Sequence, residues 1–173
     1  MIDEAKMESV MNETYPGLKL MQRDLRQRRF LQSYSVGDLL NDDRAIAGTF
    51  LARAPGYDVQ YAILSNRLQR PPEGLGEARW AMAMLPKGGR FKVLDIYRAQ
   101  GKTQIALLHL PKHEWQVFAD ISTNVDELLV DYVRKSFDVR LNSPAPAEFE
   151  GEAWGRLCQY AVGFSDMGAA IPL

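Results

Sequence analysis

The stretch ARWAMAMLPKGGRFKVLDIYRAQGKTQIALLHLPKHEWQVFADI, residues 78–121, decides the fold that we expect for this chain. Its side chains alternate with a period of two, as Trp80, Met82 and Met84 do against the smaller or aliphatic residues between them. A period of two is typical of β-strands. Short segments rich in Pro, Gly and Lys divide the stretch into four strands. Because such short connections join antiparallel neighbours, the stretch predicts a four-stranded antiparallel β-meander.

Segments with helical spacing flank this stretch on both sides. In each of them, apolar side chains recur every three or four residues. The clearest helix follows the stretch, with Thr123 or Ser122 as its N-cap. The segments expected to be helical are 18–25, 39–50, 57–68, 123–137 and 149–164.

The order of helices, strands and helices predicts a single α+β domain over residues 1–173. In this fold, N-terminal helices and C-terminal helices cover the meander of residues 78–121. The third strand, around residues 105–108, is apolar on both of its faces. We therefore expect it to be central and covered on both sides.

The composition excludes several classes of function. With 21 basic and 22 acidic side chains, the net charge of −1 gives no overall field that would attract nucleic acid or anionic lipid. No apolar run approaches the roughly 20 residues of a membrane-spanning helix, and the acidic start lacks a secretory signal. Cys158 is the only cysteine, so an internal disulfide is excluded. These features predict a soluble, cytoplasmic protein.

A cluster of basic residues between positions 19 and 29 is the one marked charge feature. If residues 18–25 form a helix, these side chains lie apart from its apolar face. Such a stripe is typical of a solvated helix face, but it also suits phosphates or an acidic protein partner. An acidic protein is favoured over nucleic acid, because no stacking aromatics lie between the basic residues. The candidate partner-binding residues are Lys19, Arg23, Arg26 and Arg29.

Two short motifs invite a chemical interpretation. Residues 101–103, Gly-Lys-Thr, match the end of a phosphate-binding loop, but Ile96 stands where that loop needs its first glycine. A hairpin turn explains them better. His109 and His113 have the spacing of helix-borne metal ligands, but Pro111 lies between them. The pattern therefore favours a strand-terminal histidine and a turn histidine, and no metal site is assigned.

Candidate catalytic groups also have simpler explanations. Cys158 is a possible nucleophile if a histidine lies beside it, but its position on an apolar segment favours a small packed side chain. Capping and solvation account for the acidic groups, and sheet packing for the tryptophans and methionines. No catalytic residue and no cofactor are assigned. The acidic groups considered are Asp42, Asp43, Glu148, Glu150 and Glu152.

The function expected from these patterns is a non-catalytic protein-interaction module, such as an adaptor, a chaperone-like escort or an inhibitor of another protein. Its partner is expected to be a protein with an acidic surface. The alternative is a small enzyme or ligand-binding domain with a pocket between sheet and helices, involving His109, Cys158 or the acidic groups. A third hypothesis is nucleic-acid binding through a basic helix over residues 19–29.

Overall fold

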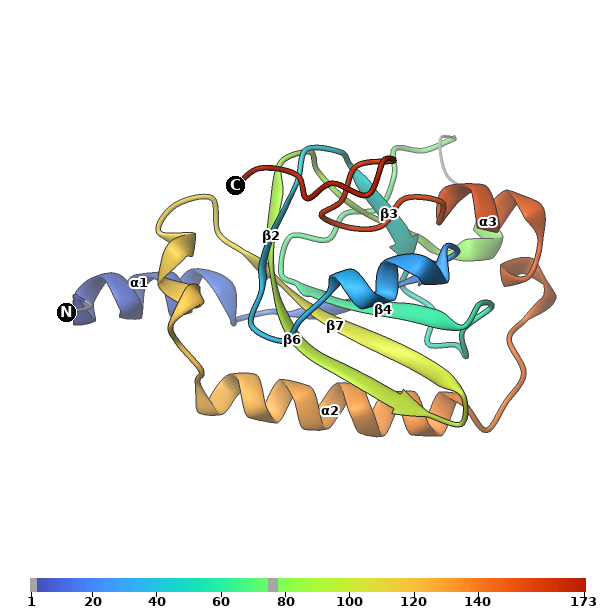
Figure 1. The fold of residues 1–173 in the computed structure, drawn as a ribbon, viewed down its shortest axis with the longest axis horizontal. Helices are drawn as coiled ribbons and strands as arrows, with labels where there is room; N and C mark the ends of the chain where they lie inside the picture. Colours follow the sequence, from blue (N-terminus) through green and yellow to red (C-terminus); the bar gives the residue numbers. More distant parts are fainter. Residues whose placement is uncertain (1–2, 75–77) are drawn as a thin grey trace.

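The computed structural model describes residues 3–74 and 78–173, and a seven-stranded mixed β-sheet forms its centre (Figure 1). The sheet order is β2-β6-β7-β4-β1-β3-β5. Strands β4 and β7 run parallel, and the other neighbouring pairs are antiparallel. The strands are β1 (Lys19–Leu25), β2 (Leu39–Asp42), β3 (Ile46–Thr49), β4 (Val59–Ser65), β5 (Met82–Leu85), β6 (Gly89–Ala99) and β7 (Lys102–Leu110).

The predicted four-stranded antiparallel meander over residues 78–121 is wrong. The β6–β7 hairpin is present, but β5 pairs with β3 at the far edge of the sheet. The predicted fourth strand is instead a 3-10 helix, η3 (Trp115–Ala119). Four further strands, β1 to β4, come from the part of the chain predicted to be helical.

Burial of both sheet faces explains why helical spacing misled the prediction. In β1, Met21 and Leu25 pack on one face of the sheet, whereas Leu18 and Leu20 pack on the other. In β4, likewise, Tyr61 packs on the first of these faces and Ala62 on the second. A strand that is covered on both faces carries apolar residues at odd and even positions, so a spacing of three or four arises without a helix.

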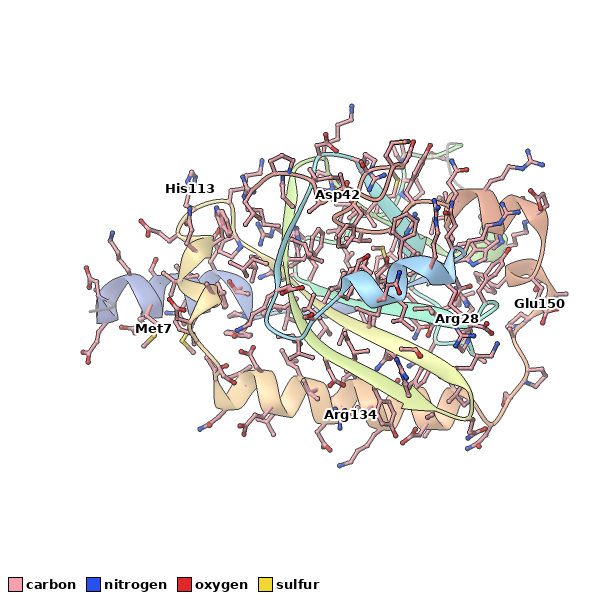
Figure 2. The ribbon with its side chains drawn as sticks, viewed as in Figure 1. Met7, Arg28, Asp42, His113, Arg134 and Glu150 are labelled. Carbon is pink, nitrogen blue, oxygen red and sulfur yellow. The ribbon has the colours of Figure 1, made fainter. Side chains whose placement is uncertain are left out.

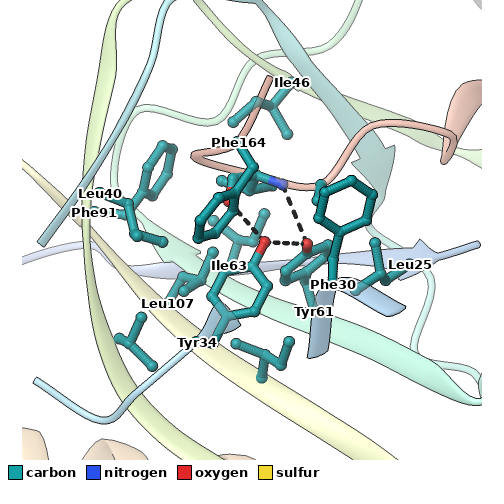
Figure 3. Packing of buried hydrophobic residues seen from close by; sticks show 14 of the residues in the cluster. Leu25, Phe30, Tyr34, Leu40, Ile46, Tyr61, Ile63, Phe91, Leu107 and Phe164 are labelled. Atoms are coloured by element: carbon teal, nitrogen blue, oxygen red, sulfur yellow. Dashed lines mark hydrogen bonds between the residues drawn. The ribbon is translucent and has the colours of Figure 1, made fainter. Parts of the chain in front are cut away.

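Helices and irregular segments cover the two faces. The first face is covered by the 3-10 helix η1 (Arg28–Ser33) and by residues 161–164 near the C-terminus (Figure 3). The second face is covered by α1 (Glu4–Thr14), η3 and α2 (Asn124–Arg140). A third, smaller cluster lies among η2 (Ala78–Trp80), η4 (Ala147–Phe149) and α3 (Glu152–Leu157).

Two predictions about individual elements are confirmed. Helix α2 begins after Thr123, which forms a capping box with Asp126. Strand β7, the predicted third strand, lies between β6 and β4. Its Leu107 packs in the first cluster and Leu108 in the second, so it is covered on both sides. None of the helices in residues 3–74 and 78–173 is long and apolar enough to cross a membrane.

Candidate anion-binding site

A small cleft lies at the edge of the sheet where the parallel strands β4 and β7 both end. The turn between β5 and β6 closes its third side. Its cavity volume is about 40 Å³, far below the roughly 300–1,000 Å³ of pockets for drug-sized ligands, so the cleft suits one small group of a ligand and not a whole ligand. Crevices beyond the carboxyl ends of parallel strands are common ligand sites. The lining residues are Arg67, Pro86, Lys87, Gly88, Gly89, Arg90, His109, Leu110 and Lys112.

Two glycines shape the turn between β5 and β6. Gly88 has φ of +80°, a left-handed conformation that side chains other than glycine rarely adopt. At Gly89, a Cβ atom would lie 2.9 Å from the ring of Phe91 and 3.5 Å from Nε2 of His109. Because Gly89 carries no side chain, the turn comes close to the histidine and holds Lys87 and Arg90 beside the cleft.

The guanidinium groups of two arginines that line the cleft have unpartnered donors. Nε and Nη2 of Arg67 and Nη1 of Arg90 are buried and make no hydrogen bond. Burial lowers the pKa of Arg67, and the carboxylate of Glu13 partly offsets this effect. The guanidinium of Arg90 lies 4.6 Å from the ring centroid of Trp115. Buried donors without partners each cost about 1–3 kcal/mol, so they require an explanation at this site.

His109 lies at the inner end of the cleft as a neutral side chain. The hydroxyl of Ser65 accepts a hydrogen bond from the backbone N–H of Arg67, at 3.0 Å, and is 2.8 Å from Nδ1 of His109. Ser65 and Nδ1 of His109 share a hydrogen bond, and the neutral ring carries its proton on one of its two nitrogens. Burial, together with the charge of Arg67, lowers the pKa of His109 to about 3. The ring also stacks on Phe91, with centroids 5.1 Å apart.

This arrangement is suited to holding an anion. Four cationic side chains, Arg67, Lys87, Arg90 and Lys112, line the cleft, and no carboxylate from the described parts of the chain does. Within residues 3–74 and 78–173, none of the four forms an ion pair. Proton transfer is disfavoured here, because Ser65 is fully buried and a histidine with such a low pKa is a weak base.

The candidate partner-binding residues do not share one surface. Lys19 and Arg23 belong to strand β1, so the predicted basic helix over residues 19–29 is wrong. Arg23 is buried and donates to the carbonyl oxygens of Ala47 and Tyr160. Nucleic-acid binding through a basic helix therefore loses its structural basis.

The two remaining candidates of this group lie after β1 and are exposed. Arg26 forms an ion pair with Glu152 at 3.4 Å. Arg29 belongs to η1, where its guanidinium lies over the ring of Phe30 and its Nε donates to Gln27. Of the four candidates, Arg29 is the one that lines an open groove beside β6.

The other candidate groups are dispersed. Residues 101–103 follow the hairpin turn between β6 and β7, as the sequence predicts. His113 is exposed in the turn after β7 (Figure 2) and does not line the cleft. Burial raises the pKa of Cys158 to about 12, which keeps the thiol protonated. In the part of the chain that the structure describes, no three His, Cys, Asp or Glu side chains are placed to hold a metal ion.

The acidic groups serve local structure. Asp42 does not cap a helix, as the sequence suggested, but ends β2 and accepts hydrogen bonds from Arg44 and from the backbone N–H of Gly163. Glu152 lies in the first turn of α3 and pairs with Arg26. Neither group faces the cationic cleft.

Sequence reasoning missed Arg67 and Arg90, which dominate the cleft. The available signal was the run Lys87-Gly88-Gly89-Arg90, in which cations and glycines follow directly after a strand. Its turn chemistry was recognised, but nothing in the sequence shows that Arg67 comes to lie against it. That juxtaposition depends on β4 and β7 being parallel neighbours.

The chain is similar to several solved structures. No family model and no curated protein matches the chain. HopU1, an ADP-ribosyltransferase of Pseudomonas syringae pv. Tomato DC3000, is 15% identical, with 54% of this chain and 45% of HopU1 covered and a TM-score of 0.46. The C3 exoenzyme of Clostridium limosum is 10% identical, with 62% and 67% covered and a TM-score of 0.47.

A third similar structure is Exoenzyme S from Pseudomonas aeruginosa, in complex with human 14-3-3 protein beta and bound to carba-NAD. It is 14% identical, with 73% of this chain and 62% of that chain covered and a TM-score of 0.47. The chain spans about half the length of HopU1. No residue role is carried over from these structures.

These comparisons contradict the function predicted from the sequence. HopU1 is an enzyme, whereas the sequence predicted a non-catalytic adaptor, escort or inhibitor. The prediction of a protein that only mediates protein–protein interaction is therefore wrong. Exoenzyme S shows that a protein with a similar fold does have a protein partner.

Proposed function

We propose that this chain binds a ligand through a phosphate group in the cationic cleft at the ends of β4 and β7. One observation carries the proposal: buried guanidinium nitrogens of Arg67 and Arg90 lack partners among the described residues, in a cleft that no described carboxylate lines. An anion would supply the missing acceptors, and Lys87 and Lys112 would add charge. This belongs to the ligand-binding alternative that the sequence left open.

A phosphate group fits these donors better than a single carboxylate does. Arginine presents a planar fork of donors that matches phosphate oxygens, and lysine acts as a point charge beside it. The donors come from three segments, the ends of β4 and β7 and the turn before β6, so they surround the cleft. A tetrahedral anion accepts from several directions at once.

Thermal melting in the presence of inorganic phosphate tests the proposal. Ligand at 100 times its Kd stabilises a protein by about 2.7 kcal/mol. For a chain of this size, that corresponds to a rise in Tm of roughly 5–10 °C. The rise should be absent in Arg67→Gln and in Arg90→Gln. The matched control is Arg70→Gln, because Arg70 is exposed and lies outside the cleft; it should respond like the unmodified chain.

The stability of the ligand-free variants separates a binding role from a structural one. If the buried charge of Arg67 exists for a ligand, Arg67→Gln should leave the Tm without phosphate unchanged or raise it. A large fall in that Tm, or a phosphate response that survives in both variants, would refute the proposal. NAD is titrated in parallel, with release of nicotinamide as the readout, because ADP-ribosyl transfer is the activity by which HopU1 is named.

The proposal also includes the domain organisation, the cellular location and the protein partner that the sequence predicts. Residues 1–173 act as one domain. The protein works in the cytoplasm, where a free thiol such as Cys158 is stable. A protein partner with an acidic surface would contact Arg29, the candidate that lines the open groove beside β6.

A further inference from the structure

Strand β6 has an outer edge that is only half paired. Strand β2 is shorter than β6 and pairs with Gly89 to Lys92, and two backbone hydrogen bonds from residues 37 and 38 extend the pairing to Val93. The chain then continues through residues 94–99, of which residues 95–99 pair with β7 on their other side. Among the described residues, no strand pairs with the outer edge of this half (Figure 1). A free edge presents unpaired backbone N–H and C=O groups.

An open groove runs beside this free edge. It has a volume of about 490 Å³ and lies between η1 and the second half of β6. Leu31 and Ile96 give it an apolar floor, and both pack against the first core cluster. Ile96 and Arg98 lie two residues apart in β6, so their side chains point to the same face, toward the groove. The lining residues are Arg28, Arg29, Leu31, Gln32, Tyr34, Ile96 and Arg98.

The rim of the groove is cationic. Arg28, Arg29 and Arg98 line it, and none of the carboxylates that the structure describes does. Arg28 extends from the start of η1 (Figure 2), and its single ion pair, with Asp58 at 3.6 Å, joins two largely exposed side chains. Such a pair contributes about 0–1 kcal/mol, so Arg28 can exchange it for another carboxylate. Arg98 is exposed and forms no ion pair within residues 3–74 and 78–173.

From these three features we infer that the free edge of β6 docks an extended acidic peptide segment of another protein, which adds to the sheet as a strand. Backbone hydrogen bonds to residues 94–99 would provide affinity, and the groove would provide selectivity. The residue opposite Ile96 would be apolar, and the residue opposite Arg98 would be acidic, because directly opposed side chains on one face interact. This inference is independent of the phosphate site, which lies at the other end of β6.

Charged residues also protect sheet edges from unwanted pairing, and Arg98 alone would fit that role. Protection of the edge does not account for the apolar floor of the groove, which lies between Arg28 and Arg29 on one side and Arg98 on the other. The docking of a peptide does, since alternate side chains of an added strand would meet the floor and the rim.

The inference is tested with a synthetic seven-residue peptide, blocked at both ends, in which Glu, Leu and Glu alternate with Thr and Ser. Binding is followed by NMR through amide shifts and hydrogen exchange. We expect saturable shifts and slower exchange at residues 94–99. The double variant Arg28→Glu, Arg98→Glu should weaken binding about tenfold or more, a change of about 1.4 kcal/mol. The control Arg70→Glu changes an exposed arginine outside the groove and should bind as the unmodified chain does.

Two altered peptides complete the test. A peptide with Lys in place of Glu should not bind, because it repels the arginine rim. A peptide with N-methyl groups on its edge-facing amides should not bind either, because it cannot pair with a strand. Binding that survives N-methylation, or that is equally strong in the double variant, would overturn the inference. So would an absence of protection at residues 94–99. None of these outcomes would change the phosphate response of Arg67 and Arg90.

Discussion

Tyr34, Tyr61 and Val162 show how single polar atoms hold the C-terminal segment on the sheet. The backbone N–H of Val162 donates to the hydroxyl oxygen of Tyr61, and the hydroxyl of Tyr34 donates to the carbonyl of Val162 (Figure 3). The contact between the two phenols then runs from Tyr61 to Tyr34. The ring of three hydrogen bonds is closed. Burial raises the pKa of Tyr61 to about 12, so its proton stays in place at ordinary pH.

His109 should make folding sensitive to acid. Its pKa is about 3 in the folded chain, against 6.5 for a freely solvated histidine, so the unfolded chain binds the proton between these values. Stability from this residue is therefore complete above about pH 6.5 and is lost as the pH falls toward 3. Between pH 7 and pH 4.5, the loss should be roughly 2–3 kcal/mol.

Urea unfolding at a series of pH values measures this loss. In His109→Gln, the free energy of unfolding should fall less on acidification than in the unmodified chain. His113→Gln is the matched control, because His113 is exposed, and it should keep the full acid sensitivity. Equal slopes in all three proteins would show that His109 is not the residue responsible.

At this scale, the sequence reveals some of the candidate site but not its centre. His109 was expected at a strand end, and it is found near the end of β7. Residues 86–89 were expected to form a turn; residues 86–88 do so, and Gly89 is the first residue of β6. Arg67 could not be assigned, because its role depends on a distant segment of the chain. For Arg23 the sequence predicted a functional role that the structure does not support. Its spacing indicates a solvated basic stripe, but the side chain is buried and donates to two carbonyl oxygens.

Among the elements, helix α2 has the most complete start signal. The side chain of Thr123 accepts from the backbone N–H of Asp126, and Asp126 accepts in return from the backbone N–H of Thr123. Tyr15 adds a hydrogen bond to Asp126 at 2.7 Å, which links the cap to the end of α1. Reciprocal caps of this kind satisfy two of the free donors at a helix start.

Thr123→Ala should destabilise the protein by about 1 kcal/mol, since the cap of α2 is lost. Ser122→Ala is a matched control, because Ser122 is exposed and lies one residue before the cap. Its free energy of unfolding should stay within about 0.5 kcal/mol of the unmodified chain. Chemical denaturation of the two variants compares them directly. If Ser122→Ala proved the more damaging change, the assignment of the cap to Thr123 would be incorrect.

An element with one buried face could be predicted from its sequence pattern, whereas a strand with two buried faces could not. Helix α2 buries one face, on β6 and β7, and keeps exposed charged positions such as Glu127 and Asp131 on the other, so its period survives in the sequence. In β1 and β4, every residue from Met21 to Leu25 and from Val59 to Ser65 is buried. Their polar members, Gln22 and Gln60 among them, are buried too, which removes the alternation that marks a strand.

At the scale of the molecule, distant parts of the chain meet at one buried carboxylate. Asp24 in β1 forms an ion pair with Arg53 and accepts hydrogen bonds from the backbone N–H of Gly56 and from Nε1 of Trp154. These partners lie 29 to 130 residues away in the sequence. Removing one partner of a buried ion pair costs about 3–5 kcal/mol. The first and last thirds of the chain are therefore coupled through this one carboxylate.

The central strands couple the two faces of the sheet in the same way. Leu107 and Leu108 are adjacent in β7, and both are fully buried, but they belong to different core clusters. Loss of either cluster would expose the other face of the same strands. We therefore predict that the chain unfolds in one cooperative step.

Urea unfolding of Leu107→Ala and Leu108→Ala tests this prediction. Each substitution should cost about 2–5 kcal/mol, because it leaves a cavity in a packed core. Amide signals in NMR spectra follow each face through a helix that covers it, η1 for the first face and α2 for the second. Both signals should shift together in both variants, with one midpoint, as two-state unfolding requires. If Leu107→Ala moved one signal and Leu108→Ala the other, the faces would unfold separately, and the proposal of a single domain over residues 1–173 would be refuted.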